Sequence, residues 1–296
     1  MKHAVLGAGG VGGLIAAALA QDGQDVLLVL RPETLEVYPG GLYVESPTLG
    51  QLDVEIPAAS RLDRQVDVLW ITVKATQLEA ALRVASPAVA RNAVVVPLLN
   101  GIDHVARIRE VFGEVVVPGA IRVESERVGS GHIVHSSPFA ALELAPPPAL
   151  RTRATAVAAE LQSAGLSCYV AESEAQVLWG KLSILAPMAL ATSSIQQPIG
   201  GVRRDQNTCA LMLEAMREVR AVATTQGAEL DAEALESILL STPDNFRTSM
   251  QKDLSAGRAL ELDAIAGPIV RVGREHEIPT PATLELVRRV AAAQAL

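Results

Sequence analysis

Five residues near the start of the chain have the composition and spacing of a phosphate-binding loop. Gly7, Gly9 and Gly12 fit the pattern G-x-G-x-x-G, with Gly10 and Val11 between the last two. In such loops the first glycine permits a tight turn, the second lets a pyrophosphate approach the backbone, and the third allows close packing of helix on strand. The helix that follows presents free N–H groups to the phosphates. These five residues predict a dinucleotide-binding loop; a glycine-rich turn without a ligand is the alternative.

Arg31, Lys74 and Asn100 each follow a predicted strand, at the edge where sheets of this kind bind ligands. An NAD enzyme carries Asp or Glu at the end of the second strand, whereas this chain has Arg31 there and Glu33 two residues later. Because a guanidinium suits a 2′-phosphate, Arg31 favours NADPH over NADH. We expect Lys74 and Asn100 to bind the cofactor as well, unless they are a solvent-exposed lysine and a turn-forming asparagine.

Further segments follow these residues in a recognisable order. They are Ile71-Thr72-Val73-Lys74, Leu98-Leu99-Asn100-Gly101, Leu178-Trp179-Gly180-Lys181-Leu182 and Glu261-Leu262-Asp263-Ala264-Ile265. Together with the glycine-rich loop and Arg31, they resemble the ketopantoate reductase (2-dehydropantoate 2-reductase) family. The matching segments run from residue 1 to about residue 290.

This resemblance implies a Rossmann domain followed by a helical domain, and reduction of 2-dehydropantoate (ketopantoate) to pantoate by NADPH, a step of pantothenate biosynthesis. It implies that Lys181 is the general acid and that Glu261 is the active-site carboxylate. It assigns substrate binding to Asn100, Lys181 and Ser249. The cofactor would be held by the glycine-rich loop, Arg31, Lys74 and Asn100.

The chemistry of the reaction agrees with the role of Lys181. Hydride delivery to a ketone leaves an alkoxide, which needs a proton and a positive charge nearby. Lys181 lies in a stretch, residues 177–201, that contains no other charged residue. A carboxylate such as Glu261 would orient the ammonium group. The alternatives are a lysine that snorkels from a core helix and a glutamate that faces solvent.

Three positions depart from the family pattern. The family places asparagines four and eight residues after the lysine, where this chain has Leu185 and Ala189, and a third where it has Ala266. A site that lacks these amides should favour a polyhydroxylated substrate much less. Reduction of a less polar ketone or an imine is therefore an alternative function, and a non-catalytic NADP(H)-binding regulator is another. Other polar side chains offer compensation, namely Ser183, Thr192, Ser193 and Arg247.

The elements that must position these residues alternate between strand and helix in the first half. Strands are predicted at Lys2–Leu6, 25–30, 66–73, 93–99 and from 115 to 118, and helices at 12–21, 77–85 and 102–111. Such alternation predicts parallel βαβ units and a doubly wound sheet. Residues 121–144 have an extended pattern with a turn at Gly129-Ser130-Gly131, which predicts antiparallel strands at the far edge of this sheet.

The second half is helical in pattern. Apolar residues from Cys209 to Ala223 recur at spacings of three and four, and Leu262 to Val270 repeat the pattern. Gly227, Pro243 and Pro279 are expected to separate the helices. The fold class is therefore an α/β Rossmann-type N-terminal domain (1–170) plus an all-α C-terminal domain (171–296).

Composition limits the partners. The net charge of -8 and the 3% of aromatic residues argue against nucleic acid. No segment is long and apolar enough to span a membrane, and five glycines between Gly7 and Gly13 argue against a signal peptide. The five histidines and two cysteines have no spacing typical of a metal site. We expect a cytoplasmic protein with a small oxo-acid substrate; the apolar helical half is compatible with a homodimer.

Overall fold

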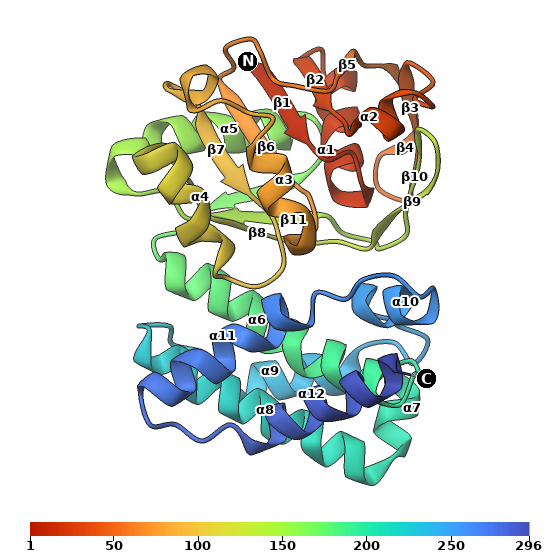
Figure 1. Ribbon diagram of the computed structural model, residues 1–296, viewed down its shortest axis with the longest axis vertical. Coiled ribbons are helices and arrows are strands. Elements are labelled where there is room, and N and C mark those ends of the chain that lie inside the picture. The colour runs from red at the N-terminus through yellow and green to blue at the C-terminus, as the bar shows by residue number, and fades with distance from the viewer. Residues whose placement is uncertain (296) are drawn as a thin grey trace. The chain divides into compact units, whose positions relative to one another are not determined.

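The computed structural model describes residues 1–295. The chain divides into two compact units, which are described one at a time. The first contains residues 1–99 and 104–177, and the second contains residues 100–103 and 178–295 of the described chain. Figure 1 shows strands and helices in the first unit and helices in the second.

A sheet of five parallel strands forms the centre of the first unit, in the order β5-β2-β1-β6-β7. The strands are β1 (Lys2–Leu6), β2 (Asp25–Val29), β5 (Ala58–Ala59), β6 (Val68–Ile71) and β7 (Val94–Pro97). The helices of this unit are α1 (Gly10–Gln21), α2 (Pro32–Leu35), α3 (Leu78–Leu82), α4 (His104–Phe112) and α5 (Arg151–Ser163). This strand order is that of a Rossmann fold, so the predicted doubly wound sheet is confirmed.

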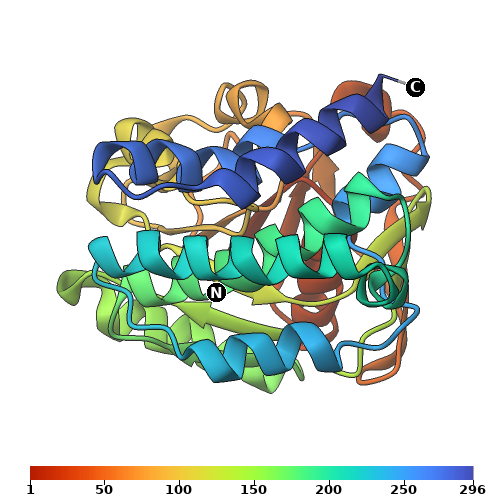
Figure 2. The same cartoon turned by 90° about the horizontal axis from the view of Figure 1, so that it is seen from below.

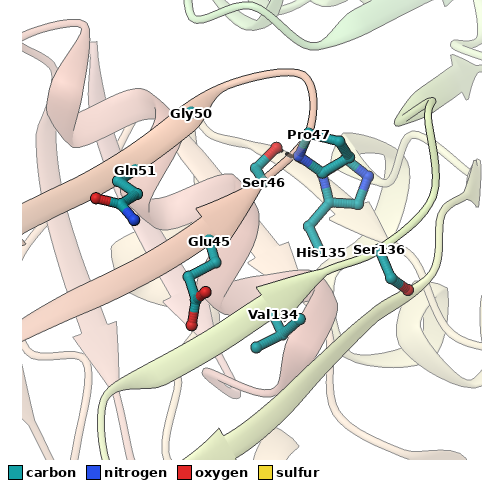
Figure 3. Close-up of a pocket in the computed structure, with 8 residues that line it drawn as sticks. All are labelled: Glu45, Ser46, Pro47, Gly50, Gln51, Val134, His135 and Ser136. Atoms are coloured by element: carbon teal, nitrogen blue, oxygen red, sulfur yellow. Dashed lines mark hydrogen bonds between the residues drawn. The ribbon is translucent and has the colours of Figure 1, made fainter.

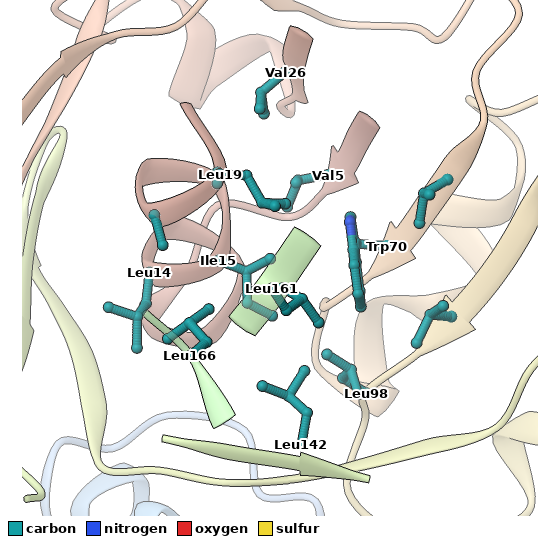
Figure 4. Close-up of a cluster of buried hydrophobic side chains, with 14 of the residues drawn as sticks. Val5, Leu14, Ile15, Leu19, Val26, Trp70, Leu98, Leu142, Leu161 and Leu166 are labelled. Atoms are coloured by element: carbon teal, nitrogen blue, oxygen red, sulfur yellow. The ribbon is translucent and has the colours of Figure 1, made fainter. Parts of the chain in front are cut away.

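The strands read as continuous apolar runs because both faces of the sheet are covered. On one face Val5 and Trp70 pack with residues of α1 and α5, as Figure 4 shows for Ile15 and Leu161. On the other face, the alternate strand residues pack with apolar side chains of α3 and α4. The glycine-rich loop lies at the carboxyl end of β1, the central strand of this doubly covered sheet.

Two smaller sheets complete the first unit. One has the order β4-β3-β10-β9, and the other β12-β11-β8. Their strands are β3 (Gly41–Ser46), β4 (Gly50–Glu55), β8 (Gly119–Arg122), β9 (Ser125–Gly129), β10 (His132–His135), β11 (Ala141–Leu144) and β12 (Ser167–Val170). The predicted antiparallel strands are present, but the β9–β10 hairpin is not at the edge of the parallel sheet, because β10 pairs with β3 instead.

Short 3-10 turns change some of the predicted bounds. They are Ala75–Gln77, Pro87–Ala90, Gly113–Val115 and Pro148–Leu150. The predicted helix at 77–85 is shorter, because a 3-10 turn takes Gln77, α3 ends at Leu82, and Ala85 forms a bridge with Leu62 instead. The predicted strand at 115–118 makes only a single bridge, from Val116 to Val95 of β7, before β8 begins.

The second unit is built from helices. They are α6 (Glu174–Ser194, whose first residues belong to the first unit), α7 (Ile199–Arg204), α8 (Gln206–Thr225), α9 (Ala232–Ser241), α10 (Ser249–Ser255), α11 (Leu262–Glu275) and α12 (Pro281–Gln294). The long helix α8 contacts α7, α9, α11 and α12, and Figure 2 shows it in teal beside the blue α12. Gly227, Pro243 and Pro279 lie between helices, as predicted.

The fold class, a Rossmann-type α/β unit plus an all-α unit, is confirmed. Among residues 1–295, no helix combines the length and the apolar character that crossing a bilayer requires. Both cysteines have free thiols, and burial raises the pKa of the Cys168 thiol to about 12.

Candidate active site

The glycine-rich loop has the conformation that its sequence predicts. Gly7 has a φ of 99°, and a side chain at Gly12 would come within 2.2 Å of the Gly7 carbonyl oxygen. The third glycine therefore allows the first turn of α1 to pack on the loop. A side chain at Gly10 would likewise meet the Ser125 carbonyl oxygen at 2.0 Å.

Gly9 is different, because a Cβ atom there would meet nothing within 4 Å. Packing of the protein therefore does not explain the absence of a side chain at this position, whereas the approach of a phosphate would. Gly9 is the N-cap of α1, and the first turn of that helix contains no acidic residue. The amides at the start of a helix lack acceptors within it. The residues present thus fit the pyrophosphate of a dinucleotide.

Two hydroxyl groups that the sequence did not single out hold this loop. Thr72 Oγ1 donates a hydrogen bond to the Gly7 carbonyl oxygen at 2.7 Å, while the Gly7 amide donates to Val29 O at 3.2 Å. Ser125 Oγ donates to the Gly10 carbonyl oxygen at 2.9 Å. Thr72 stands in the motif next to Val73 and Lys74, which was the available signal; Ser125, 115 residues from Gly10, had none.

Arg31 and Lys74 belong to the same unit as the loop. Arg31 follows β2 as the N-cap residue of α2, and its exposed guanidinium Nη1 lies 3.3 Å from Glu33 Oε1. Lys74 is the half-buried N-cap residue of the 3-10 turn that follows β6. The neighbouring Val73 packs against Gly7. Because β2, β1 and β6 are adjacent and parallel, the structure places both cations past the carboxyl ends of strands next to the loop.

Asn100 and Glu261 are brought together in the second unit. The Asn100 amide Nδ2 donates to Glu261 Oε2 at 3.0 Å, although 161 residues separate the two. Glu261 is 8% exposed and is the N-cap residue of α11. The sequence predicted both as site residues but not the bond between them, because nothing local in either segment specifies it.

The loop that carries Asn100 is fixed to α11 by further contacts. Gly101 has a φ of 80°, and a Cβ atom there would lie 2.0 Å from the Ala264 carbonyl oxygen. Arg271 Nη2 lies 2.5 Å from Asp103 Oδ2, and its Nη1 lies 2.8 Å from Asp263 Oδ1. Arg271 therefore ties the loop to the start of α11, a role that the sequence did not indicate.

Lys181 lies on α6 between two buried residues, Trp179 and Leu182, and is itself half-buried. Leu185 and Ala189 follow at spacings of four and eight, so they lie on the Lys181 face of this helix. Ala189 is fully buried, and Ala266 on α11 is almost fully buried. Ser249 is exposed as the first residue of α10.

The polar side chains that offered compensation are mostly engaged elsewhere. Ser183 Oγ donates to Gly180 O, and Thr192 Oγ1 donates to Met188 O and pairs with Thr248 Oγ1. Arg247 donates a hydrogen bond to the Ser255 hydroxyl.

The exception is Ser193, whose buried hydroxyl has no hydrogen-bond partner among residues 1–295. The same holds for both amide atoms of the fully buried Gln251.

A cavity of about 450 Å³ lies elsewhere in the first unit, between the β3–β4 turn and the end of β10. Figure 3 shows Ser46 and His135 facing each other there, with Nδ1 2.8 Å from Oγ. His135 Nε2 also contacts Ser137 Oγ and Phe139 O. His132, on the same strand, pairs with Glu45 instead. No group of His, Cys, Asp and Glu in the described part of the chain is arranged to hold a metal ion.

Comparison with known families covers both units. The family model described as "Ketopantoate reductase PanE/ApbA" matches residues 3–148. The model described as "Ketopantoate reductase PanE/ApbA C terminal" matches residues 175–294. The chain belongs to the ketopantoate reductase family. Ketopantoate reductases are oxidoreductases that use a nicotinamide cofactor, which confirms a nicotinamide dinucleotide as the predicted cofactor.

Individual ketopantoate reductases match over nearly their full length. The chain is 29% identical to the 2-dehydropantoate 2-reductase of Caulobacter vibrioides, over 98% of each chain. A PanE/ApbA family ketopantoate reductase from Ralstonia eutropha superposes with a TM-score of 0.89 at 28% identity, over 100% of this chain and 99% of that one. D-mandelate dehydrogenase, solved with NADH and anilino(oxo)acetate, has the same fold, with a TM-score of 0.89 at 23% identity over the same shares.

Proposed function

We propose that the protein reduces a 2-oxo acid to a 2-hydroxy acid with NADPH, and that 2-dehydropantoate is the first substrate to test. The glycine-rich loop carries the proposal. It lies at a helix N-terminus with open space over Gly9 and no acidic side chain in the first helical turn. Membership of the ketopantoate reductase family, over both units, supports the same reaction.

When bound, NADPH would supply the hydride that converts a ketone carbon to an alcohol carbon. The protein must then protonate the oxygen, and Lys181 is the residue proposed to give its Nζ proton to it. The positive charge of Lys181 also stabilises the negative charge that develops on that oxygen. Glu261 would orient the ammonium group, and its own position is fixed by the hydrogen bond from Asn100. Ser249 is proposed as a substrate contact.

The role of Lys181 is tested by Lys181→Ala. Because general acid catalysis contributes about 10²–10⁴-fold, we expect kcat to fall by that factor. NADPH affinity, measured by fluorescence titration, should change less than about twofold, since the loop that binds the pyrophosphate is untouched. A variant that keeps near-normal turnover would remove Lys181 from the mechanism.

The preference for NADPH is proposed from Arg31. Its guanidinium is exposed at the end of β2, where the fold reads the adenosine ribose. Arg31→Asp should weaken binding of NADPH far more than binding of NADH. Equal losses for the two cofactors would contradict the assignment.

A less polar 2-oxo acid is the second candidate substrate. Leu185 and Ala189 make the Lys181 face of α6 apolar, and Ala266 on α11 also lacks a polar group. Four polar side chains could replace the amides that are absent here, but three of them are already hydrogen-bonded within the protein, namely Ser183, Thr192 and Arg247. Together these observations favour a substrate with a branched or aromatic apolar side chain.

A substrate panel separates the candidates. NADPH oxidation would be followed with 2-dehydropantoate and with branched and aromatic 2-oxo acids at equal concentrations. A higher kcat/KM for 2-dehydropantoate supports the first candidate, and a higher value for the apolar acids supports the second. Tight NADPH binding without turnover on any of them would point instead to a regulator.

A further inference from the structure

Arg31 and Glu33 form an ion pair at the position where the adenosine ribose of the cofactor would bind. Arg31 Nη1 lies 3.3 Å from Glu33 Oε1, and the two side chains are 57% and 64% exposed. The Arg31 backbone is fixed, since its carbonyl oxygen accepts the amides of Thr34 and Leu35 at 2.9 Å each. The guanidinium and the carboxylate therefore meet through side chains that can still rotate.

Each partner of this pair suits a different cofactor. Arg31 and Glu33 follow Gly12 by 19 and 21 residues, and the fold places the residue that reads the ribose about 20 residues after the glycines. A carboxylate there accepts a hydrogen bond from the 2′-hydroxyl of NADH. A guanidinium there binds the 2′-phosphate of NADPH.

We infer that Glu33 is a cofactor-specificity residue, and that the pair lets this chain accept NADH as well as NADPH. The inference rests on the proposed role of Arg31. To bind NADPH, Arg31 must turn part of its guanidinium from Glu33 toward the 2′-phosphate, and that phosphate then lies near a carboxylate of like charge. To bind NADH, Glu33 accepts the 2′-hydroxyl while Arg31 remains beside it. The pair therefore weakens binding of NADPH and strengthens binding of NADH. It reduces the preference for NADPH over NADH that Arg31 alone would give.

The exposure of the pair makes such an exchange accessible. Ion pairs between exposed side chains are weak, so Arg31 can move from Glu33 to a phosphate at small cost. A phosphate carries more charge than a carboxylate and offers three acceptor oxygens, so it competes well for the guanidinium.

The test measures dissociation constants for NADPH and NADH with the intact protein and with Glu33→Gln. We expect NADPH to bind about threefold to tenfold more tightly to the variant, and NADH to bind about threefold more weakly. Glu36→Gln is the matched control, because Glu36 is exposed, ends the same short helix α2 and carries the same charge. The control should change neither constant by more than about twofold.

Arg31→Ala distinguishes failure of the inference from failure of the proposed function. If Arg31→Ala weakens NADPH selectively but Glu33→Gln leaves the ratio of the two constants unchanged, the inference is overturned and the NADPH proposal stands. If Arg31→Ala weakens both cofactors equally, the proposed preference fails and the inference fails with it. A Glu33→Gln effect that Glu36→Gln reproduces would reduce the result to net charge and also overturn the inference.

Discussion

At the scale of single residues, hydrogen bonds within the protein set the geometry of the groups that are proposed to bind the cofactor and the substrate. Thr72 holds the Gly7 peptide from one side while Val29 holds it from the other. Asn100 holds the Glu261 carboxylate in the same way. Thr72 stands within a recognisable motif, but the motif does not predict either hydrogen bond, because each one joins segments that are distant in sequence.

Thr72→Val should weaken NADPH binding, because it removes the hydroxyl that fixes the Gly7 carbonyl while keeping the side-chain shape. The loss of one hydrogen bond corresponds to an increase in Kd of about threefold to tenfold. Fluorescence titration measures it, and Thr72→Ser should restore the affinity. Unchanged binding by Thr72→Val would show that the loop keeps its shape without this bond.

Gln251→Leu should leave the free energy of unfolding unchanged or raise it by about 1 kcal/mol. The Gln251 amide is fully buried without a partner in the described chain, and an apolar side chain of similar size removes that desolvation cost. Urea unfolding measures the change, and Ser193→Ala should behave alike. A loss of more than about 1 kcal/mol would indicate that the amide is hydrogen-bonded in solution.

At the scale of elements, some helix termini are completed by residues of other helices. The N-cap residue of α12, Thr280, makes no side-chain capping bond. Glu218 of α8 instead accepts hydrogen bonds from the amides of Ala282 and Thr283 at 2.7 and 2.8 Å, and from the Thr283 hydroxyl at 2.7 Å. This buried carboxylate both pairs the free amides and lies at the positive end of the α12 dipole.

Glu218→Ala should therefore destabilise the helical unit by about 3 kcal/mol, since three buried donors lose a charged acceptor. Glu218→Gln, which keeps one acceptor oxygen, should lose less. The exposed Glu214, one turn earlier on α8, provides the control: Glu214→Ala should change the free energy by less than about 0.5 kcal/mol. Equal effects at the two positions would refute the capping role.

The elements also show how far the sequence could predict the fold. Strand and helix alternation predicted the parallel sheet because apolar runs and glycines mark each βαβ unit. The β3–β4 hairpin was not predicted, and β10 was assigned to the wrong sheet. Short strands such as these are specified by their partners, and β10 pairs with β3 some 90 residues earlier. The glycine-rich loop was predictable for the opposite reason, since its chemistry is contained in six consecutive residues.

At the scale of the whole molecule, each unit contains one of the two tryptophans. Trp70 lies in the first unit, and its Nε1 donates to His3 Nδ1 at 3.2 Å. His3 Nε2 lies 2.9 Å from Glu160 Oε2. In the neutral ring, Nδ1 therefore accepts the hydrogen bond from Trp70 and Nε2 donates one to Glu160. Trp179 lies in the second unit. The two residues can therefore report the unfolding of the two units separately.

We expect the first unit to lose stability as the pH falls below about 6.5. Burial lowers the pKa of His3 from its ordinary value of 6.5, with Glu160 opposing the shift. The unfolded chain therefore binds the proton first, and stability present above that pH is lost between 6.5 and the lower folded-state pKa. Denaturant unfolding of Trp179→Phe, in which only Trp70 reports, measures the loss.

Two controls accompany this measurement. His3→Gln should flatten the pH dependence of the first unit. The transition seen through Trp179 in Trp70→Phe should depend less on pH in this range. In the helical unit, Arg288 and Arg289 lower the pKa of Glu285 to about 2, so this carboxylate titrates only in more acidic solution. Identical pH dependence of both transitions would contradict the assignment to His3.

The assignment of residues 100–103 to the helical unit has a consequence for dissecting the gene. The chain enters that unit at Asn100, leaves it at His104 and returns at Leu178. A cut after Val177 would therefore yield a C-terminal fragment without the amide that holds Glu261 and without the Asp103 partner of Arg271. Mixing the two fragments should restore both contacts, which the C-terminal fragment lacks when it is expressed alone. We expect an added tetrapeptide of residues 100–103 to restore less, because it lacks the covalent links to Leu99 and His104 that hold the loop in the N-terminal fragment.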